Sequence, residues 1–262
     1  MINYFSNLDH TIQALIATIF TFSVTALGAS IVFIFKKINK NVMDAMLGFA
    51  AGVMIAASFW SLLEPSISMA ESLHMIPWVV AFSGFFLGGL FLFVGDKIYV
   101  HFNKHINNKK KRCLMLIFSI TVHNIPEGLV IGLTFGSLKY GIDGVTLGAA
   151  CLLALGIGLQ NFPEGTAVAV PLRREGVSRF KAFIIGSLSG IVEPIAGIIG
   201  AILVLKVRYL LPFLLAFAAG AMIYVVVQEL IPESQTNKRK DFMALFTLIG
   251  FSIMMILDVA LG

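Results

Sequence analysis

The chain has 262 residues, of which 58% are hydrophobic and only 13% are charged. Soluble domains are about 45–50% apolar and about 25% charged, so this composition excludes an ordinary water-soluble globular protein. The formal net charge of +5 does not indicate nucleic-acid binding, because the basic residues are confined to short segments between apolar stretches.

Apolar stretches of about 20 residues recur along the chain, and each is long enough to cross a hydrocarbon core of about 30 Å as a helix. The sequence predicts eight spans: 11–35, 42–63, 77–98, 113–138, 144–171, 181–205, 209–231 and 242–261. No basic segment precedes the first stretch and no small-residue cleavage site follows it, so we interpret it as a retained helix. We therefore expect an all-α polytopic membrane protein, with one transmembrane domain over residues 1–262 and a cytoplasmic loop at 99–112. The two cysteines, Cys113 and Cys151, fall within spans and are expected to be buried free thiols.

The basic residues between the spans predict the topology. Of the 19 Lys and Arg residues, 16 lie in alternate linkers, and this bias marks the cytoplasmic side of a membrane. These residues are Lys36, Lys37, Lys40, Lys97, Lys104, Lys109, Lys110, Lys111, Arg112, Arg173, Arg174, Arg179, Lys181, Lys238, Arg239 and Lys240. We expect a multi-pass protein of a bacterial inner membrane with both termini outside the cytoplasm.

A short internal repeat links the two ends of the chain. The heptamer FAAGVMI at 49–55 recurs as FAAGAMI at 217–223. The first copy opens an outward-running span and the second an inward-running one, so 11–98 and 181–261 are predicted to form an inverted repeat. Secondary transporters commonly bind their substrate near the midplane between such repeats. Convergent use of Gly and Ala for close helix packing is the alternative explanation.

Two similar polar motifs lie in the central spans at 113–171: HNIPEG at 123–128 and QNFPEG at 160–165. In each motif, the glutamate and the residue four positions earlier share a helix face, and an asparagine flanks that face. Each proline removes a backbone hydrogen bond, which frees the carbonyls of Val122 and Leu159 as further oxygen ligands. The candidate metal ligands are His123, Asn124, Glu127, Gln160, Asn161 and Glu164.

The charge balance inside the membrane favours a bound cation. A third carboxylate, Glu193, lies near the middle of the sixth span. A charged group at the bilayer centre costs about 2.5–3.5 kcal/mol, and the interiors of the eight spans contain no Lys or Arg to compensate. The missing positive charge must come from protons or from a cation that is not part of the chain.

The nitrogen and oxygen donors suit Zn²⁺, Fe²⁺, Mn²⁺ or Co²⁺ better than Cu⁺. Other readings remain open. His123 is a satisfied core histidine in one of them, the three amides are hydrogen-bonding links between helices in another, and Glu193 is a protonated structural carboxyl in a third. Several further polar residues are candidates for the entrance and exit of a metal pathway. The alternative is that they are ordinary polar residues of the membrane interface. They are Glu64, Glu71, His74 and Asp258 on the outer side, and Gln228 and Glu229 on the inner side.

With HNIPEG and QNFPEG in adjacent central spans of an eight-span layout, the chain resembles the ZIP (Zrt/Irt-like) family of metal transporters. Because its second motif begins with Gln rather than His, the chain most resembles the bacterial GufA-type subgroup. The resemblance implies a 3+2+3 arrangement of helices, with spans 1–3 and 6–8 around spans 4 and 5. It also implies an elevator-like movement of one helix group against the other.

The same resemblance implies a two-metal site. The first metal is held by His123, Glu127, Gln160 and Glu164, and the second by Asn124, Asn161 and Glu193 together with the two bridging glutamates. Met54 matches a family position whose thioether reaches the first metal, although it also fits a packing role in the repeat. Many relatives have Asp where this chain has Asn161, so the second site loses a charge. His101 and His105 are at most a remnant of the His-rich loops of some relatives.

The resemblance also implies inward transport of divalent transition metals, and we expect Zn²⁺ as the main cargo, with Cd²⁺, Fe²⁺, Mn²⁺ and Co²⁺ as further cargo. No catalytic residue or cofactor is expected, the partners are the metal ion and the bilayer, and a homodimer is left open. The alternatives are an intramembrane zinc-dependent hydrolase and a proton or sodium carrier. The sequence contains no H-E-x-x-H and no G-x-S-x-G motif, which argues against the hydrolase.

Overall fold

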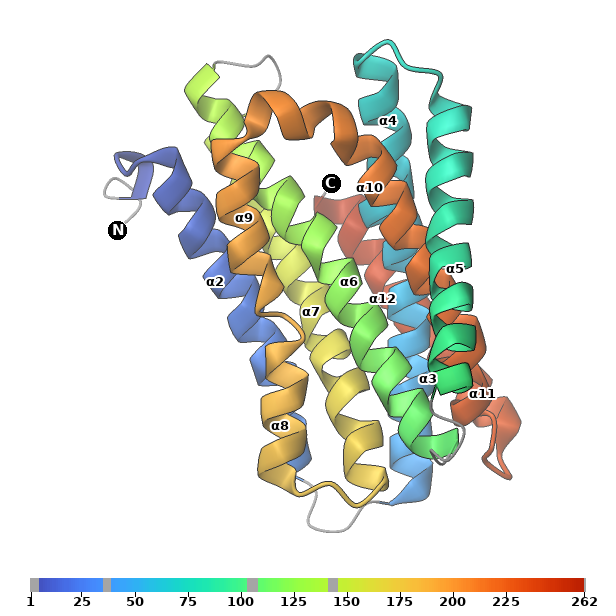
Figure 1. Ribbon diagram of the computed structural model, residues 1–262. Coiled ribbons are helices and arrows are strands. Elements are labelled where there is room, and N and C mark those ends of the chain that lie inside the picture. Colours follow the sequence, from blue (N-terminus) through green and yellow to red (C-terminus); the bar gives the residue numbers. More distant parts are fainter. Residues whose placement is uncertain (1–4, 35–38, 103–107, 141–145, 262) are drawn as a thin grey trace.

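The computed structural model describes residues 5–34, 39–102, 108–140 and 146–261 (Figure 1). Helices account for nearly all of these residues, and no strand occurs among them. The α-helices are α2 (His10–Ala29), α3 (Lys40–Ala57), α4 (Glu64–Ser72), α5 (Pro77–Phe102), α6 (Asn108–Ser137), α7 (Leu147–Arg174), α8 (Arg179–Leu188), α9 (Val192–Ile202), α10 (Val204–Val225), α11 (Ile231–Ser234) and α12 (Lys240–Leu261). Short 3-10 turns at Ser30–Phe33 and Leu138–Tyr140 extend α2 and α6, and π-helical segments at Ser58–Leu63 and Val226–Leu230 join α3 to α4 and α10 to α11.

Several helix starts have local caps that explain their position. The Asp9 carboxylate accepts from the backbone N–H of Thr11 at 2.9 Å, and the Thr146 hydroxyl accepts from that of Ala149 at 3.1 Å. Such caps satisfy N–H groups that a helix leaves unpaired at its first turn. The long helices then alternate in direction along the bundle, and the two ends of the described chain lie towards the same end of it (Figure 1).

The outer surface of the bundle carries many large apolar side chains, whereas its interior contains buried polar residues among the hydrophobic ones. Six helical segments are long and apolar enough to cross a membrane by length and composition: His10–Phe33, Lys40–Ser72, Pro77–Ile98, Arg179–Ile202, Val204–Ser234 and Lys240–Ala260. Trp78, Phe82 and Val259 are each about two-thirds exposed or more, whereas Gln13, Thr18 and Asn161 are fully buried. Water would disfavour such a surface, but lipid favours it. The protein is therefore a multi-pass membrane protein.

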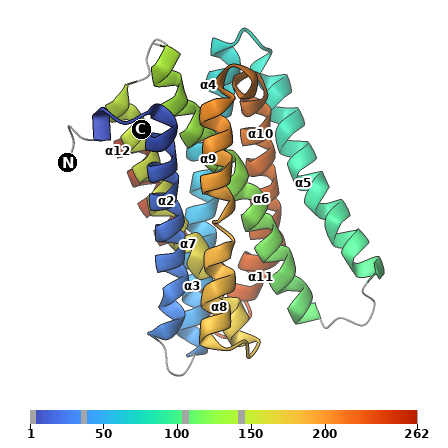
Figure 2. The ribbon, with the colours of Figure 1, turned by 60° about the vertical axis from the view of Figure 1, so that its left-hand side comes forward.

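The helices pack in two groups. In one, α3 lies along α12 and α5 lies along α10; in the other, α2 lies along α7 and α6 lies along α9. Figure 2 shows α5 at one edge of the bundle beside α10, far from α2. The groups meet where α10 contacts α6 and where α3 contacts α7.

The repeated heptamers occupy corresponding places in the first group. They lie in α3 and α10, which run in opposite directions (Figure 1), and each helix continues into a π-helical segment. A methyl group on Gly52 would clash with the carbonyl oxygen of Thr247 in α12, and one on Gly220 with that of Phe85 in α5. In each copy the glycine therefore lets its helix pack backbone to backbone against its neighbour.

The predicted spans differ from the helices in three respects. The sixth span is not continuous, because the helix breaks at residues 189–191 and restarts as α9 at Val192. Glu71 and His74 were expected in an outer loop, but Glu71 belongs to helix α4. His74 lies after the end of α4 and has a positive φ of 55°. Cys151, expected to be buried, is exposed on the outer face of α7, whereas Cys113 is buried as predicted. His101 and His105 lie outside the residues whose side chains the structure describes.

A polar network joins the two helix groups near the end of the bundle where α3 begins and α7 ends. Arg174, the last residue of α7, forms ion pairs with Asp44 of α3, at 3.6 Å, and with Glu233 of α11. Asn237 donates from Nδ2 to Asp44 Oδ2 at 2.8 Å. Asp44 is fully buried, so its charge depends on these partners.

We expect Asp44→Ala to lower the free energy of unfolding by about 1–3 kcal/mol, because Arg174 and Asn237 then lose a buried acceptor. The thermal unfolding midpoint in detergent measures the effect. Glu71→Ala, which removes an exposed carboxylate, should leave the midpoint unchanged. Equal midpoints for the two variants would show that the network contributes nothing to stability.

Candidate metal centre

The two polar motifs face each other from antiparallel helices. HNIPEG lies in α6 and QNFPEG in α7, and both helices run unbroken through Pro126 and Pro163. Neither proline breaks its helix: the residues before and after each proline are α-helical. The motif side chains are consequently held on rigid helical backbone rather than on a loop.

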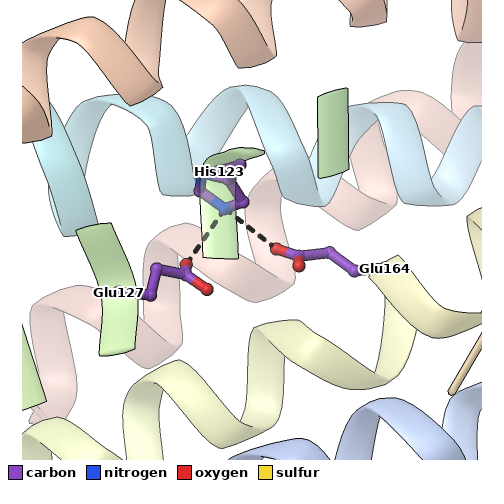
Figure 3. A group of neighbouring side chains, drawn as sticks. All are labelled: His123, Glu127 and Glu164. Atoms are coloured by element: carbon purple, nitrogen blue, oxygen red, sulfur yellow. Dashed lines mark hydrogen bonds and ion pairs between the residues drawn. The ribbon is translucent and has the colours of Figure 1, made fainter. Parts of the chain in front are cut away.

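Three of these side chains converge on one point. His123 Nε2 lies 3.0 Å from Glu127 Oε1, four residues along α6, and 3.3 Å from Glu164 Oε1 of α7. Figure 3 shows the two carboxylates approaching the imidazole from either side. One ligand atom from each residue lies within 4.8 Å of the others, and all three residues are buried. This is the spacing at which three side chains can share one cation.

Gln160 completes this cluster from α7. Its Nε2 donates to Glu127 Oε1, and the residue is fully buried. Four atoms of the cluster nevertheless have no hydrogen-bond partner among the described residues: His123 Nδ1, Glu127 Oε2, Gln160 Oε1 and Glu164 Oε2. Buried acceptors without partners are costly, and a metal ion bound between these side chains would satisfy the oxygens of Glu127, Gln160 and Glu164.

Glu193 belongs to an adjacent but separate group. Asn161 Nδ2 donates to both Glu193 carboxylate oxygens at 2.9 Å, and the Thr21 hydroxyl of α2 donates to Glu193 Oε2. Asn124 Nδ2 donates to the backbone carbonyl of Ser189 at 3.0 Å, at the break between α8 and α9. All these residues are buried.

The remaining predicted residues are distributed along the bundle. Met54 is buried in α3, which packs against α7. Glu64 and Asp258 line a cavity of about 580 Å³ between α4, α7 and α12. Ser61 donates to Asp258 Oδ1 at 2.8 Å. On the opposite side, Glu229 is buried in the π-helical segment after α10, whereas Gln228 is exposed.

Sequence reasoning missed Thr21 and the Ser189 carbonyl. Thr18, Thr21 and Thr25 are spaced by three and four residues in an apolar helix, and all three are fully buried. That spacing places them on one face, which was a usable signal. The Ser189 carbonyl lies at a helix break that Gly190 and Pro194 mark in the sequence, but no local spacing pairs this carbonyl with Asn124.

The charge balance of the centre follows from its residues. Glu127, Glu164 and Glu193 are buried together with one histidine, and no Lys or Arg ion pair to them occurs in the part of the chain that the structure describes. Imidazole, carboxylate and amide donors without a thiolate suit divalent transition metals.

Comparison with known proteins decides the family. The model of the ZIP zinc transporter family matches residues 12–113 and 101–258. The chain belongs to the ZIP family. Its ZIP relatives include zinc transporter ZIP11 of Homo sapiens, 35% identical over 95% of this chain and 97% of the relative. They also include zinc transporter GufA of Myxococcus xanthus, 32% identical over 95% and 98%, and zinc transporter ZIPB of Bordetella bronchiseptica, 34% identical over 92% and 79%. The resemblance inferred from the paired motifs is confirmed.

Proposed function

We propose that the protein carries divalent transition-metal ions, Zn²⁺ first among them, across the membrane into the cytoplasm. The observation that carries this proposal is the convergence of His123, Glu127 and Glu164 within the helices of a ZIP family member. Zinc exchanges its water ligands for these side chains and is then released, so no covalent bond is made or broken. Cd²⁺, Fe²⁺, Mn²⁺ and Co²⁺ fit the same donors, and cellular availability selects among them.

The proposed topology has eight spans in a 3+2+3 arrangement. At 1.5 Å per residue, the 30 residues of α6 and the 28 of α7 extend about 45 and 42 Å, which is enough to cross a bilayer. These two helices are less apolar than the six segments above because both carry a polar motif and α6 also begins with the basic residues at 109–112. The paired heptamers, with their π-helical continuations, support the inverted repeat of 11–98 and 181–261. Basic linkers facing the cytoplasm put both termini outside the inner membrane.

The proposed route begins at the cavity lined by Glu64 and Asp258. Ile157 also lines this cavity and lies one helical turn before Gln160 on α7. Two carboxylates at the outer mouth raise the local concentration of cations. Met54 supplies a thioether from α3, and Glu229 is the candidate residue on the exit side. Assembly as a homodimer remains a prediction.

A flux assay tests the proposal. Protein is reconstituted into liposomes that contain a zinc-sensitive dye, and external Zn²⁺ is added. We expect zinc to enter protein-containing liposomes and not protein-free ones. Absence of flux from folded, correctly inserted protein would defeat the proposal. Chelator-sensitive hydrolysis without flux would favour an intramembrane hydrolase, and sodium or proton flux without zinc flux would favour an ion carrier.

Zinc binding should weaken as the pH falls. Carboxylates and imidazole bind metal only in their deprotonated forms, so protons compete with zinc for the same atoms. We expect the apparent Kd, measured by calorimetry in detergent, to rise steadily between about pH 7.5 and about pH 5.5. A Kd that stays constant over this range would contradict coordination by these side chains.

A further inference from the structure

The Glu193 carboxylate has its partners within the protein. Asn161 donates to both of its oxygens, and Thr21 donates to one of them. Glu193 also lies in the first turn of α9, which begins at Val192, where the helix dipole favours a negative charge. The Asn161 and Thr21 donors satisfy both carboxylate oxygens without a metal ion. By contrast, Glu127 and Glu164 each keep a carboxylate oxygen without a partner among the described residues.

Backbone packs tightly around Glu193. A methyl group on Gly128 of α6 would lie 2.5 Å from the Glu193 carbonyl oxygen, and one on Gly190 would lie 3.1 Å from Glu193 Oε1. The Gly190 position is also 3.0 Å from the Thr25 hydroxyl. Gly128 therefore lets α6 approach the backbone of Glu193, and Gly190 lies directly beside the carboxylate, next to the donors that it already has.

The Asn161 amide has only one orientation that suits this arrangement. Carboxylate oxygens accept hydrogen bonds and do not donate them, so Asn161 must present Nδ2 to Glu193. The same Nδ2 lies 3.3 Å from the carbonyl oxygen of Thr21, a further acceptor. A cation beside Glu193 would face these N–H groups. Binding it requires the amide to turn its unpartnered Oδ1 inward and give up three contacts of Nδ2, whereas the Gln160 amide gives up one.

The charge balance of the three glutamates also argues against a second divalent ion. Glu127, Glu164 and Glu193 contribute three negative charges when ionised, so two divalent ions would leave an uncompensated positive charge in the membrane. One divalent ion leaves a single negative charge, and the Asn161 and Thr21 donors already stabilise it at Glu193. An aspartate at 161 would add a fourth negative charge and balance two ions.

We propose that this chain binds one metal ion, at His123, Glu127, Gln160 and Glu164, and that Asn161 and Thr21 occupy the place of a second. The two residues are positioning residues, because they hold Glu193 away from the ion through hydrogen bonds. This proposal rests on the proposed function, since it concerns the stoichiometry of the same centre.

Zinc stoichiometry tests the proposal directly. The full-length wild type in detergent is dialysed against excess Zn²⁺, and bound metal is measured by elemental analysis per chain. We expect one ion for the wild type and two for Asn161→Asp. Two ions on the wild type would overturn the proposal, and Asn161→Asp that folds and still binds one would overturn the role of Asn161.

A second variant covers failure of Asn161→Asp to fold. Glu193→Gln removes the charge and keeps the shape, and we expect it to bind one ion, as the wild type does. A drop from two ions in the wild type to one in this variant would assign Glu193 to a second metal site. A folded wild type that binds no zinc and supports no zinc flux would instead defeat the proposed function, so the two failures are distinguishable.

Discussion

We expect Glu127→Ala and Glu164→Ala each to abolish zinc flux in liposomes. Each change removes a carboxylate that lies within about 3 Å of His123 Nε2 and has an oxygen without a partner among the described residues. Loss of a residue that only orients a ligand commonly lowers metal affinity 10- to 100-fold, so loss of a ligand should lower it by more than about a hundredfold. Flux and calorimetric zinc affinity should fall together.

Two comparisons separate coordination from structural damage. Glu127→Gln keeps the size of the side chain and can still hydrogen-bond Gln160, but it should transport as poorly as alanine because the charge is lost. Asp241→Ala removes an exposed carboxylate in the first turn of α12 and should transport normally. Near-normal flux in both Glu127→Ala and Glu164→Ala, in protein that elutes as a single species, would exclude this centre as the transport site.

The first-metal ligands were predictable from sequence because they follow local rules. Residues four apart on a helix share a face, which brings His123 to Glu127 and Gln160 to Glu164. Repetition of the motif in adjacent spans then indicated that the two faces meet. The helices themselves were equally predictable from sequence, since a run of about 20 apolar residues can cross a membrane in few conformations other than a helix.

What the sequence did not reveal depends on contacts between distant segments. Gly190 and Pro194 mark the break at 189–191 in the sequence, but nothing local indicates that the Ser189 carbonyl accepts from the Asn124 amide. Thr21 reaches Glu193 across 172 residues of chain, and Arg174 reaches Asp44 in the other helix group. Neither partner can be identified from spacing within one helix. Cys151 was misplaced for a related reason, because a central span still presents one face outward.

The repeated heptamer has a packing explanation that is independent of metal binding. In the first copy, Gly52 contacts α12 through the Thr247 carbonyl, and in return a methyl group on Gly250 would clash with the Phe49 carbonyl. The second copy shows the same reciprocal contact, since Gly220 meets the Phe85 carbonyl and Gly88 meets that of Phe217. Without a hydrophobic driving force between helices in lipid, such close backbone contact is a main source of association.

We therefore expect Gly52→Val and Gly220→Val to destabilise the protein strongly, although neither residue is a proposed ligand. The added side chain must push two helices apart along their contact, and overpacking of this kind costs on the order of 3 kcal/mol. The thermal unfolding midpoint in detergent and the fraction of monodisperse protein should both fall. Gly95→Val is the matched control on α5, because nothing lies within 4 Å of a methyl group at that position. If Gly52→Val unfolds at the same temperature as Gly95→Val, the heptamer is not held by backbone contact, and its repetition needs another cause.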